Sequence, residues 1–134
     1  MNIKQIAKDT AKMLQNYLTY QAVKTVLAQL SETNPPLALW LQYFSADKLQ
    51  DGEPYIEELF REKPDLALRI MIVREHLAQE VAEYLPEMVR TGIMQANMEH
   101  RRQHLERSTQ LETFDPLSTS QEQATSDPNS EDVL

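Results

Sequence analysis

Apolar residues recur at intervals of three and four positions from Ile3 to Leu30, the spacing that places them along one side of an α-helix. No glycine or proline interrupts this segment. When successive residues are placed about 100° apart around the helix axis, the apolar side changes near Tyr17 to Tyr20. We therefore predict one long helix whose two halves bury their apolar residues against two different bodies, and a second chain is a candidate for one of them.

Two shorter helices are expected next. The sequence at residues 32–36, ETNPP, ends the first helix, because proline disfavours helical backbone in the residue before it and Asn34 is a good N-cap for the helix that follows. The segment Leu37–Phe44 is apolar almost all round, which predicts a place in the centre of the core. After a polar loop from Ser45 to Gly52, the sequence PYIEELF puts its apolar residues on one face of a third helix.

A fourth helical pattern runs from Leu66 to about Arg107 with Pro86 inside it. Proline within a helix removes one backbone hydrogen bond and clashes with the carbonyl four residues earlier, so we predict a sharp kink just before Pro86. A helix of this length would extend about 60 Å at 1.5 Å per residue, too far for a compact domain of this size. Part of it should therefore project or meet a second chain, which again predicts a dimer.

The composition agrees with helices and narrows the classes of function. Only 2 glycines and 7 prolines occur among 134 residues, whereas residues that lose little entropy in a helix are abundant. No cysteine is present, which excludes disulfides, thiolate metal sites and a cysteine nucleophile. The start of the chain lacks the apolar run of a signal peptide, and no stretch approaches the roughly 20 apolar residues of a membrane span. We expect an all-α cytoplasmic protein that does not bind a membrane.

Negative charge is concentrated at the C-terminal end. The formal net charge is -8, but residues 108–134 hold six acidic residues and no lysine or arginine, so the preceding residues are nearly neutral. The same end is rich in polar residues and proline, with too few apolar residues to offset the ordering of its backbone. We predict a helical domain at residues 1–107 and a disordered acidic tail at residues 108–134.

Few polar clusters could carry out a reaction. His100 and His104 have the spacing of two zinc ligands on one helix face, but the HExxH order is missing and neighbouring arginines would repel a cation. With two glycines, no phosphate-binding loop or dinucleotide fingerprint can be built in the usual way. The acidic residues are typical of an ordinary helical surface. We expect neither an enzyme nor a metal or cofactor site.

The arginine cluster Arg101, Arg102 and Arg107 is the best argument for a nucleic-acid partner. Such binding usually spreads over several phosphate contacts on a strongly basic domain, which this chain does not have. The alternatives are a helix end whose positive charge meets the helix dipole and an arginine patch for an acidic protein surface. We expect no nucleic acid, and a small helical nucleic-acid regulator stays only as a third hypothesis.

Tyr17 and Tyr20 lie where the apolar side of the first helix changes, and their spacing makes them neighbours on the helix. Tyrosine suits a peptide-binding groove, since its ring offers apolar area and its hydroxyl can orient a peptide. We therefore predict that these two residues line a groove between two bodies. The alternative is a structural helical dimer or regulatory scaffold without a peptide groove, in which both tyrosines belong to the core.

Four stretches of the sequence resemble the RbcX family, the assembly chaperones of the Rubisco large subunit, and the resemblance covers about residues 1–107. They are LQNYLTYQAV, SETNPPLALW, LRIMIVREHLAQEVAEYLPEM and HRRQHLER. The resemblance implies a four-helix bundle protomer with a long, bent C-terminal helix and an arc-shaped homodimer. It also implies a non-catalytic, ATP-independent chaperone of Rubisco assembly in the cytoplasm of a cyanobacterium, and it leaves association with the carboxysome open.

The resemblance further implies which residues meet the client. Tyr17 and Tyr20 would line the central dimer groove, which takes the extended C-terminal peptide of the Rubisco large subunit. A polar surface toward the ends of the arc would contact the neighbouring subunit. Our own hypothesis for release is that docking of the small subunit then removes the chaperone without ATP. The residues implied for this surface are Gln29, Glu32, Arg69 and Arg102, with Asn34, Glu75 and Arg101 as less certain members.

Overall fold

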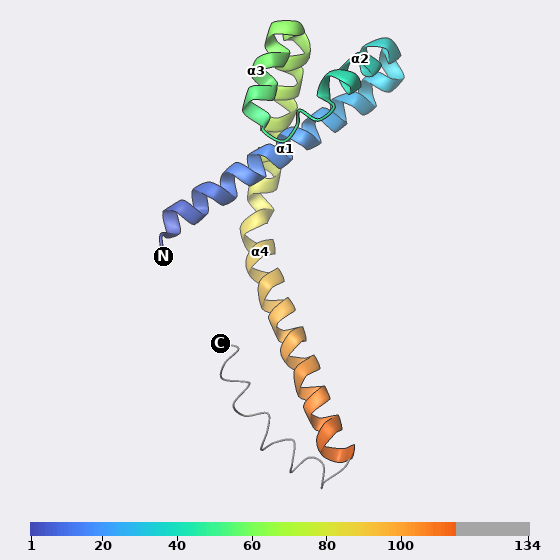
Figure 1. Cartoon of the computed structure of the whole chain (residues 1–134). Helices are drawn as coiled ribbons and strands as arrows, with labels where there is room; N and C mark the ends of the chain where they lie inside the picture. Colours follow the sequence, from blue (N-terminus) through green and yellow to red (C-terminus); the bar gives the residue numbers. More distant parts are fainter. Residues whose placement is uncertain (115–134) are drawn as a thin grey trace. The chain divides into compact units, whose positions relative to one another are not determined.

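The computed structural model describes residues 1–114, which form four α-helices and no strand (Figure 1). These are α1 (Ile3–Thr33), α2 (Pro35–Ser45), α3 (Gly52–Glu62) and α4 (Pro64–Phe114). The predicted all-α class and the long C-terminal helix are confirmed. The chain divides into two compact units, Met1–Leu85 and Pro86–Leu134, at the bond before the proline for which we predicted a kink.

Asn34 separates α1 from α2 and satisfies backbone groups of both. Its backbone N–H donates to the carbonyl of Leu30 at 2.7 Å, and its side-chain Oδ1 accepts from the N–H of Leu37 at 3.4 Å. Two prolines occupy the first turn of α2. Backbone N–H groups in the first turn of a helix have no hydrogen-bond partner within the helix, so the missing N–H of proline costs nothing there. The predicted helix break at this residue is therefore confirmed.

The core of the unit Met1–Leu85 is formed by all four helices. The second half of α1 contributes its buried apolar face, α2 and α3 lie against it, and the first turns of α4 complete the cluster. Side chains of this kind gain about 1.5–3 kcal/mol each when they are fully buried. The buried residues are Ala22, Val23, Val26, Leu30, Ala38, Leu41, Tyr55, Ile56, Leu59, Leu66, Ala67 and Ile70.

One polar pair lies inside this core. The hydroxyls of Ser45 and Tyr55 are 2.6 Å apart, and both residues are buried. Burial raises the pKa of Tyr55, while the hydrogen bond to Ser45 acts in the opposite direction. The pair joins the end of α2 to the first turns of α3 without leaving either hydroxyl unsatisfied.

The first half of α1 has no partner within the described chain. Every residue from Met1 to Met13 is exposed, including the apolar side chains of Ile3, Ile6 and Met13. Burial begins at Leu18 and continues along the other side of the helix. This agrees with the predicted change of apolar side, and it leaves one of the two expected bodies outside the single chain.

The described part of the second unit, Pro86–Phe114, is the remainder of α4. It is a helix whose side chains are exposed nearly all round, and two arginines form ion pairs along it, Arg90 with Glu87 and Arg102 with Glu99 and Glu106. No described helix is long and apolar enough to cross a membrane. Large apolar side chains are nevertheless exposed at Met88, Val89, Ile93, Met94, Met98, Leu105 and Leu111.

The predicted start of the tail at Ser108 needs correction. Helix α4 continues to Phe114, because no glycine or proline occurs in this stretch and the hydroxyl of Thr109 donates to the carbonyl of Leu105 at 2.9 Å. A threonine hydroxyl bonded to the carbonyl four residues earlier is compatible with a continuing helix. The rest of the predicted tail, residues 115–134, lies outside the described residues.

Leu59→Ala should lower the free energy of unfolding by about 2–5 kcal/mol, because it leaves a cavity in a small, well-packed core. Leu59 is 0% exposed, whereas Leu39 on α2 is 53% exposed, so Leu39→Ala is the matched control and should change stability by less than about 0.5 kcal/mol. Urea unfolding followed by circular dichroism measures both. Equal effects of the two substitutions would contradict the described core.

Candidate functional site

Two tyrosines mark the point where α1 leaves the core. Tyr17 is 57% exposed and Tyr20 is 40% exposed, whereas the two residues between them, Leu18 and Thr19, are buried. The ammonium of Lys24 lies 5.5 Å from the centroid of the Tyr20 ring. Neither tyrosine belongs to the core of the single chain, so both rings are available to a partner.

Asn16, the residue before Tyr17, holds the start of α3. Its Oδ1 accepts a hydrogen bond from the backbone N–H of Gly52 at 3.0 Å. Asp51 occupies the N-cap position of α3 but makes no capping bond with its side chain. The first turn of α3 is therefore capped by a side chain of α1, which joins the two helices at this point.

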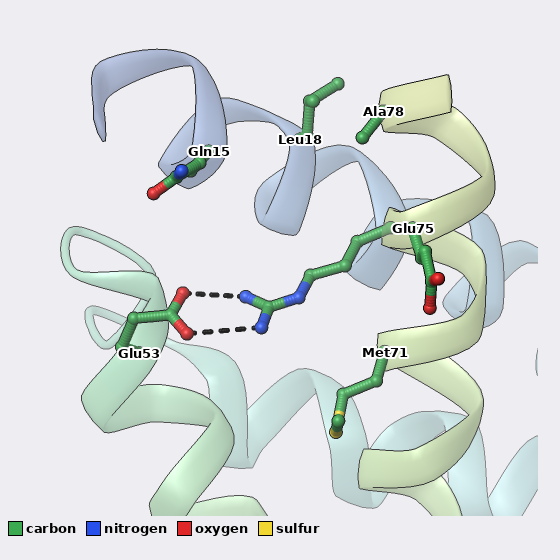
Figure 2. Close-up of a pocket in the computed structure, with 7 residues that line it drawn as sticks. Gln15, Leu18, Glu53, Met71, Glu75 and Ala78 are labelled. Atoms are coloured by element: carbon green, nitrogen blue, oxygen red, sulfur yellow. Dashed lines mark hydrogen bonds and ion pairs between the residues drawn. The ribbon is translucent and has the colours of Figure 1, made fainter. Parts of the chain in front are cut away.

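Thr19, the residue before Tyr20, is tied to both α3 and α4. Its hydroxyl donates to the carbonyl of Gln15 at 2.8 Å and accepts from Nη1 of Arg74 at 3.1 Å. Arg74 also donates to both carboxylate oxygens of Glu53, at 2.7 and 3.1 Å, and Figure 2 shows these two bonds. The bonds from Arg74 lower the pKa of Glu53, although burial opposes the change, so the carboxylate stays ionised to lower pH.

An open pocket of about 380 Å³ lies beside this ion pair (Figure 2). The side chains of α1, α3 and α4 surround it, and both apolar and charged groups line it. Its wall includes the partly exposed Arg74 and the exposed Glu75, a less certain member of the implied polar surface. The lining residues are Gln15, Leu18, Glu53, Met71, Arg74, Glu75 and Ala78.

The structure brings together two of the four residues that the resemblance implies for a polar surface. Nη2 of Arg69 on α4 donates to Oε1 of Gln29 on α1 at 2.5 Å. Glu32 follows one turn later on α1 and is exposed. A second open pocket, of about 350 Å³, borders Arg69 at the junction of α3 and α4 and includes Leu37 and Lys63 in its wall.

Arg102 lies in the other unit and is already paired within its own helix. Its guanidinium donates to Glu99 at 2.5 and 3.1 Å and to Glu106 at 2.5 Å. The bond to Glu99 and the charge of Glu106 raise the pKa of Arg102, and the bond to Arg102 lowers the pKa of Glu99. These bonds use three of the five N–H donors of the guanidinium, so an acidic client group could bond to the remaining ones.

The two histidines singled out by the sequence lie on the same exposed stretch of α4, at His100 and His104. In the part of the chain that the structure describes, no group of three or more His, Cys, Asp or Glu side chains could hold a metal ion. The neighbouring Arg102 forms ion pairs with two carboxylates, those of Glu99 and Glu106. Nothing in this geometry favours a metal site or a nucleic-acid surface.

Sequence reasoning missed the residues next to the tyrosines that bond α1 to α3 and α4. Asn16 and Thr19 interrupt an apolar stretch immediately before Tyr17 and Tyr20, and this was the available signal. The second available signal was Gly52, because the sequence contains only two glycines. Their partners could not be found by periodicity, because they lie on other helices.

Comparisons with known proteins agree with this geometry. A family model described as "RbcX protein" matches residues 1–110. The "RuBisCO chaperone RbcX" of Anabaena sp. (strain CA / ATCC 33047) is 74% identical over 129 residues, which cover 96% of each chain. The protein of the same name from Thermosynechococcus vestitus is 62% identical over 112 residues, covering 83% of this chain and 89% of the relative.

Solved structures give the same answer for the fold. A crystal structure described as RbcX in complex with substrate matches with a TM-score of 0.74 and 52% sequence identity. The match covers 82% of this chain and 100% of the other. With the family model spanning nearly all of the described residues, the chain belongs to the RbcX protein family.

Proposed function

We propose that this chain is a chaperone of Rubisco assembly that binds an extended C-terminal peptide of the large subunit at Tyr17 and Tyr20. The proposal is carried by one observation: two neighbouring tyrosines are exposed at the centre of a helix whose adjacent residues are buried. Relatives of up to 74% identity bear the name of a Rubisco chaperone, and a solved relative holds a substrate. The chain acts by binding, without catalysis and without a cofactor.

The tyrosine surface offers an affinity suited to a transient partner. An aromatic side chain of the client that buries about 200 Å² gains about 5 kcal/mol at about 25 cal/mol/Å². Two such anchors would contribute about 10 kcal/mol, from which the costs of association and of ordering an extended peptide must be subtracted. What remains is below the roughly 8 kcal/mol of a micromolar complex, so the peptide complex dissociates readily.

The groove is proposed to form between two copies of the chain. The first half of α1 and the described part of the second unit both expose apolar side chains that a soluble chain would bury against a partner. Most of the stability of helices in proteins also comes from tertiary packing of an apolar face. A homodimer removes both difficulties and brings two pairs of tyrosines into one binding site.

The polar surface of Gln29, Glu32, Arg69 and Arg102 is proposed to contact the neighbouring large subunit. Gln29 and Arg69 are already joined, so little side-chain entropy is lost when an acidic or amide group binds to them. Two weak contacts on one client give a higher overall affinity than either alone. Small-subunit docking then displaces the chaperone without ATP. The proposed compartment is the cytoplasm of a cyanobacterium.

Tyr20→Ala should weaken binding of a synthetic peptide carrying the C-terminal sequence of a Rubisco large subunit by about tenfold to a hundredfold, because an aromatic anchor is lost. Isothermal calorimetry measures the affinity, and an unchanged melting temperature shows that the variant is folded. Tyr43→Ala is the matched control, since Tyr43 on α2 is 74% exposed and lies outside the tyrosine surface. Equal loss in both variants, or no binding by the wild type, would refute the proposed site.

Met98→Glu should weaken the homodimer, because it places a carboxylate on the exposed apolar side chains of α4. Analytical ultracentrifugation should give twice the mass of one chain for the wild type and a lighter species for the variant at the same concentration. Asn97→Asp adds the same charge at an exposed polar position that points about 100° away from Met98, and it should leave the mass unchanged. A wild type that sediments as a single chain would exclude the dimer.

Arg69→Ala should separate the two client contacts. Peptide affinity should stay within about twofold of the wild type, while capture of whole large subunits falls severalfold, because only the polar surface has lost a charged hydrogen-bond donor. Calorimetry measures the first quantity and gel filtration with large subunits the second. Arg61→Ala removes an exposed arginine of α3 and should change neither. A parallel loss of both quantities in Arg69→Ala would contradict separate surfaces.

A further inference from the structure

Tyr17 and Tyr20 lie at the boundary where burial along α1 begins. After them, Val23, Val26 and Leu30 are buried in the core and set the rotation of the second half of the helix. Before them, every residue from Met1 to Met13 is exposed, so burial within the chain sets nothing there. A change of about 100° at this boundary would exchange the exposed place of Tyr20 for the buried place of Thr19, so bonds made at the boundary add to the core in setting the direction of the tyrosines.

The directional interactions at this point are polar and come from side chains that no client contact explains. Asn16 caps α3 through Gly52, and Thr19 accepts from Arg74, which is bound to Glu53. We call these five residues the α1 clamp. All of them belong to the unit Met1–Leu85, and together they join α1 to α3 and to α4.

The clamp is closely packed. Thr19 is 0% exposed, and Gly52 is also buried. A Cβ added at Gly52 would lie 3.0 Å from Oγ1 of Thr19 and 3.2 Å from Oδ1 of Asn16, closer than carbon and oxygen atoms normally approach. Any larger residue at this position would require the side chain of Thr19 or Asn16 to shift by a few tenths of an ångström, so glycine allows the start of α3 to approach α1 this closely.

Asn16 and Thr19 each immediately precede one of the two tyrosines. Successive side chains of a helix point about 100° apart, so holding Asn16 and Thr19 against α3 and α4 turns Tyr17 and Tyr20 outward. We infer that the α1 clamp is a positioning device for client binding: it holds α1 in the rotation that presents both tyrosine rings. This inference rests on the proposed function and adds the five residues of the α1 clamp to it as residues that act through the tyrosines.

Thr19→Val tests the clamp, because valine keeps the buried volume but cannot accept the bond from Arg74. We expect the affinity for the large-subunit peptide to fall by about tenfold, although Thr19 itself is too buried to touch a client. Thr19→Ser keeps the hydroxyl and should restore most of the affinity. Thr25→Val is the matched control, since the exposed Thr25 bonds only to the carbonyl of Gln21 on its own helix and should bind as the wild type does.

A double-mutant cycle with Tyr20→Ala separates positioning from general loss of stability. If Thr19 acts through the tyrosine, Tyr20→Ala should cost severalfold less affinity in the Thr19→Val background than in the wild type. Calorimetry supplies the four affinities, and melting temperatures show that each variant is folded. Full additivity, or wild-type binding by Thr19→Val, would overturn the clamp while Tyr20→Ala alone still supports the proposed function.

Arg74→Lys is the second variant, because lysine keeps the charge but cannot bond to Thr19 and to both oxygens of Glu53 at once. It should show the same coupling to Tyr20→Ala if Thr19→Val does not fold. Loss of the folded dimer in both variants would overturn the inference, since the network would then maintain the fold rather than the tyrosine orientation. Failure of the wild type to bind the peptide would instead refute the proposed function on which the inference rests.

Discussion

The burial of the second half of α1 is the interaction on which the rest of the structure depends. Val23, Val26 and Leu30 of α1 lie against α2, α3 and the first turns of α4. These side chains all belong to one buried apolar cluster, the core. This packing uses one side of one half of the helix. The other half keeps its apolar side chains exposed, so the same constraint that builds the protomer core leaves a surface for a partner.

Charged groups contribute differently in the two units. The ion pairs of Arg90 and Arg102 lie on the exposed surface of α4, where solvent screens them and such pairs contribute little to stability. Arg74 is more enclosed, is bonded to two partners and joins three helices. Its pairing with Glu53 is therefore better placed to fix the relative positions of the helices than the exposed pairs on α4 are.

A chaperone of assembly has to hold its client and then leave it. Two separate contacts of moderate strength, a tyrosine surface and a polar surface, suit this requirement better than one very tight site. Each contact can be lost in turn when another subunit competes for the client. In the inferred role of the α1 clamp, the tyrosines are held in their binding orientation before the client arrives. This lowers the entropy cost of ordering them on binding without adding contact area.

The sequence by itself determined the helices, the breaks at Asn34 and before α4, and the change of apolar side at Tyr17 to Tyr20. Through a resemblance to a known family, it also indicated the residues proposed to meet the client. These features depend on local spacing and capping, which a single chain segment contains. It placed the end of α4 too early, since composition alone did not separate a polar helix end from a tail. Only the tertiary structure joined Gly52 to Asn16, Arg69 to Gln29 and Arg74 to Thr19, pairs that are 36, 40 and 55 positions apart. Such pairs depend on how each helix is rotated against its neighbours, and periodicity does not specify that rotation.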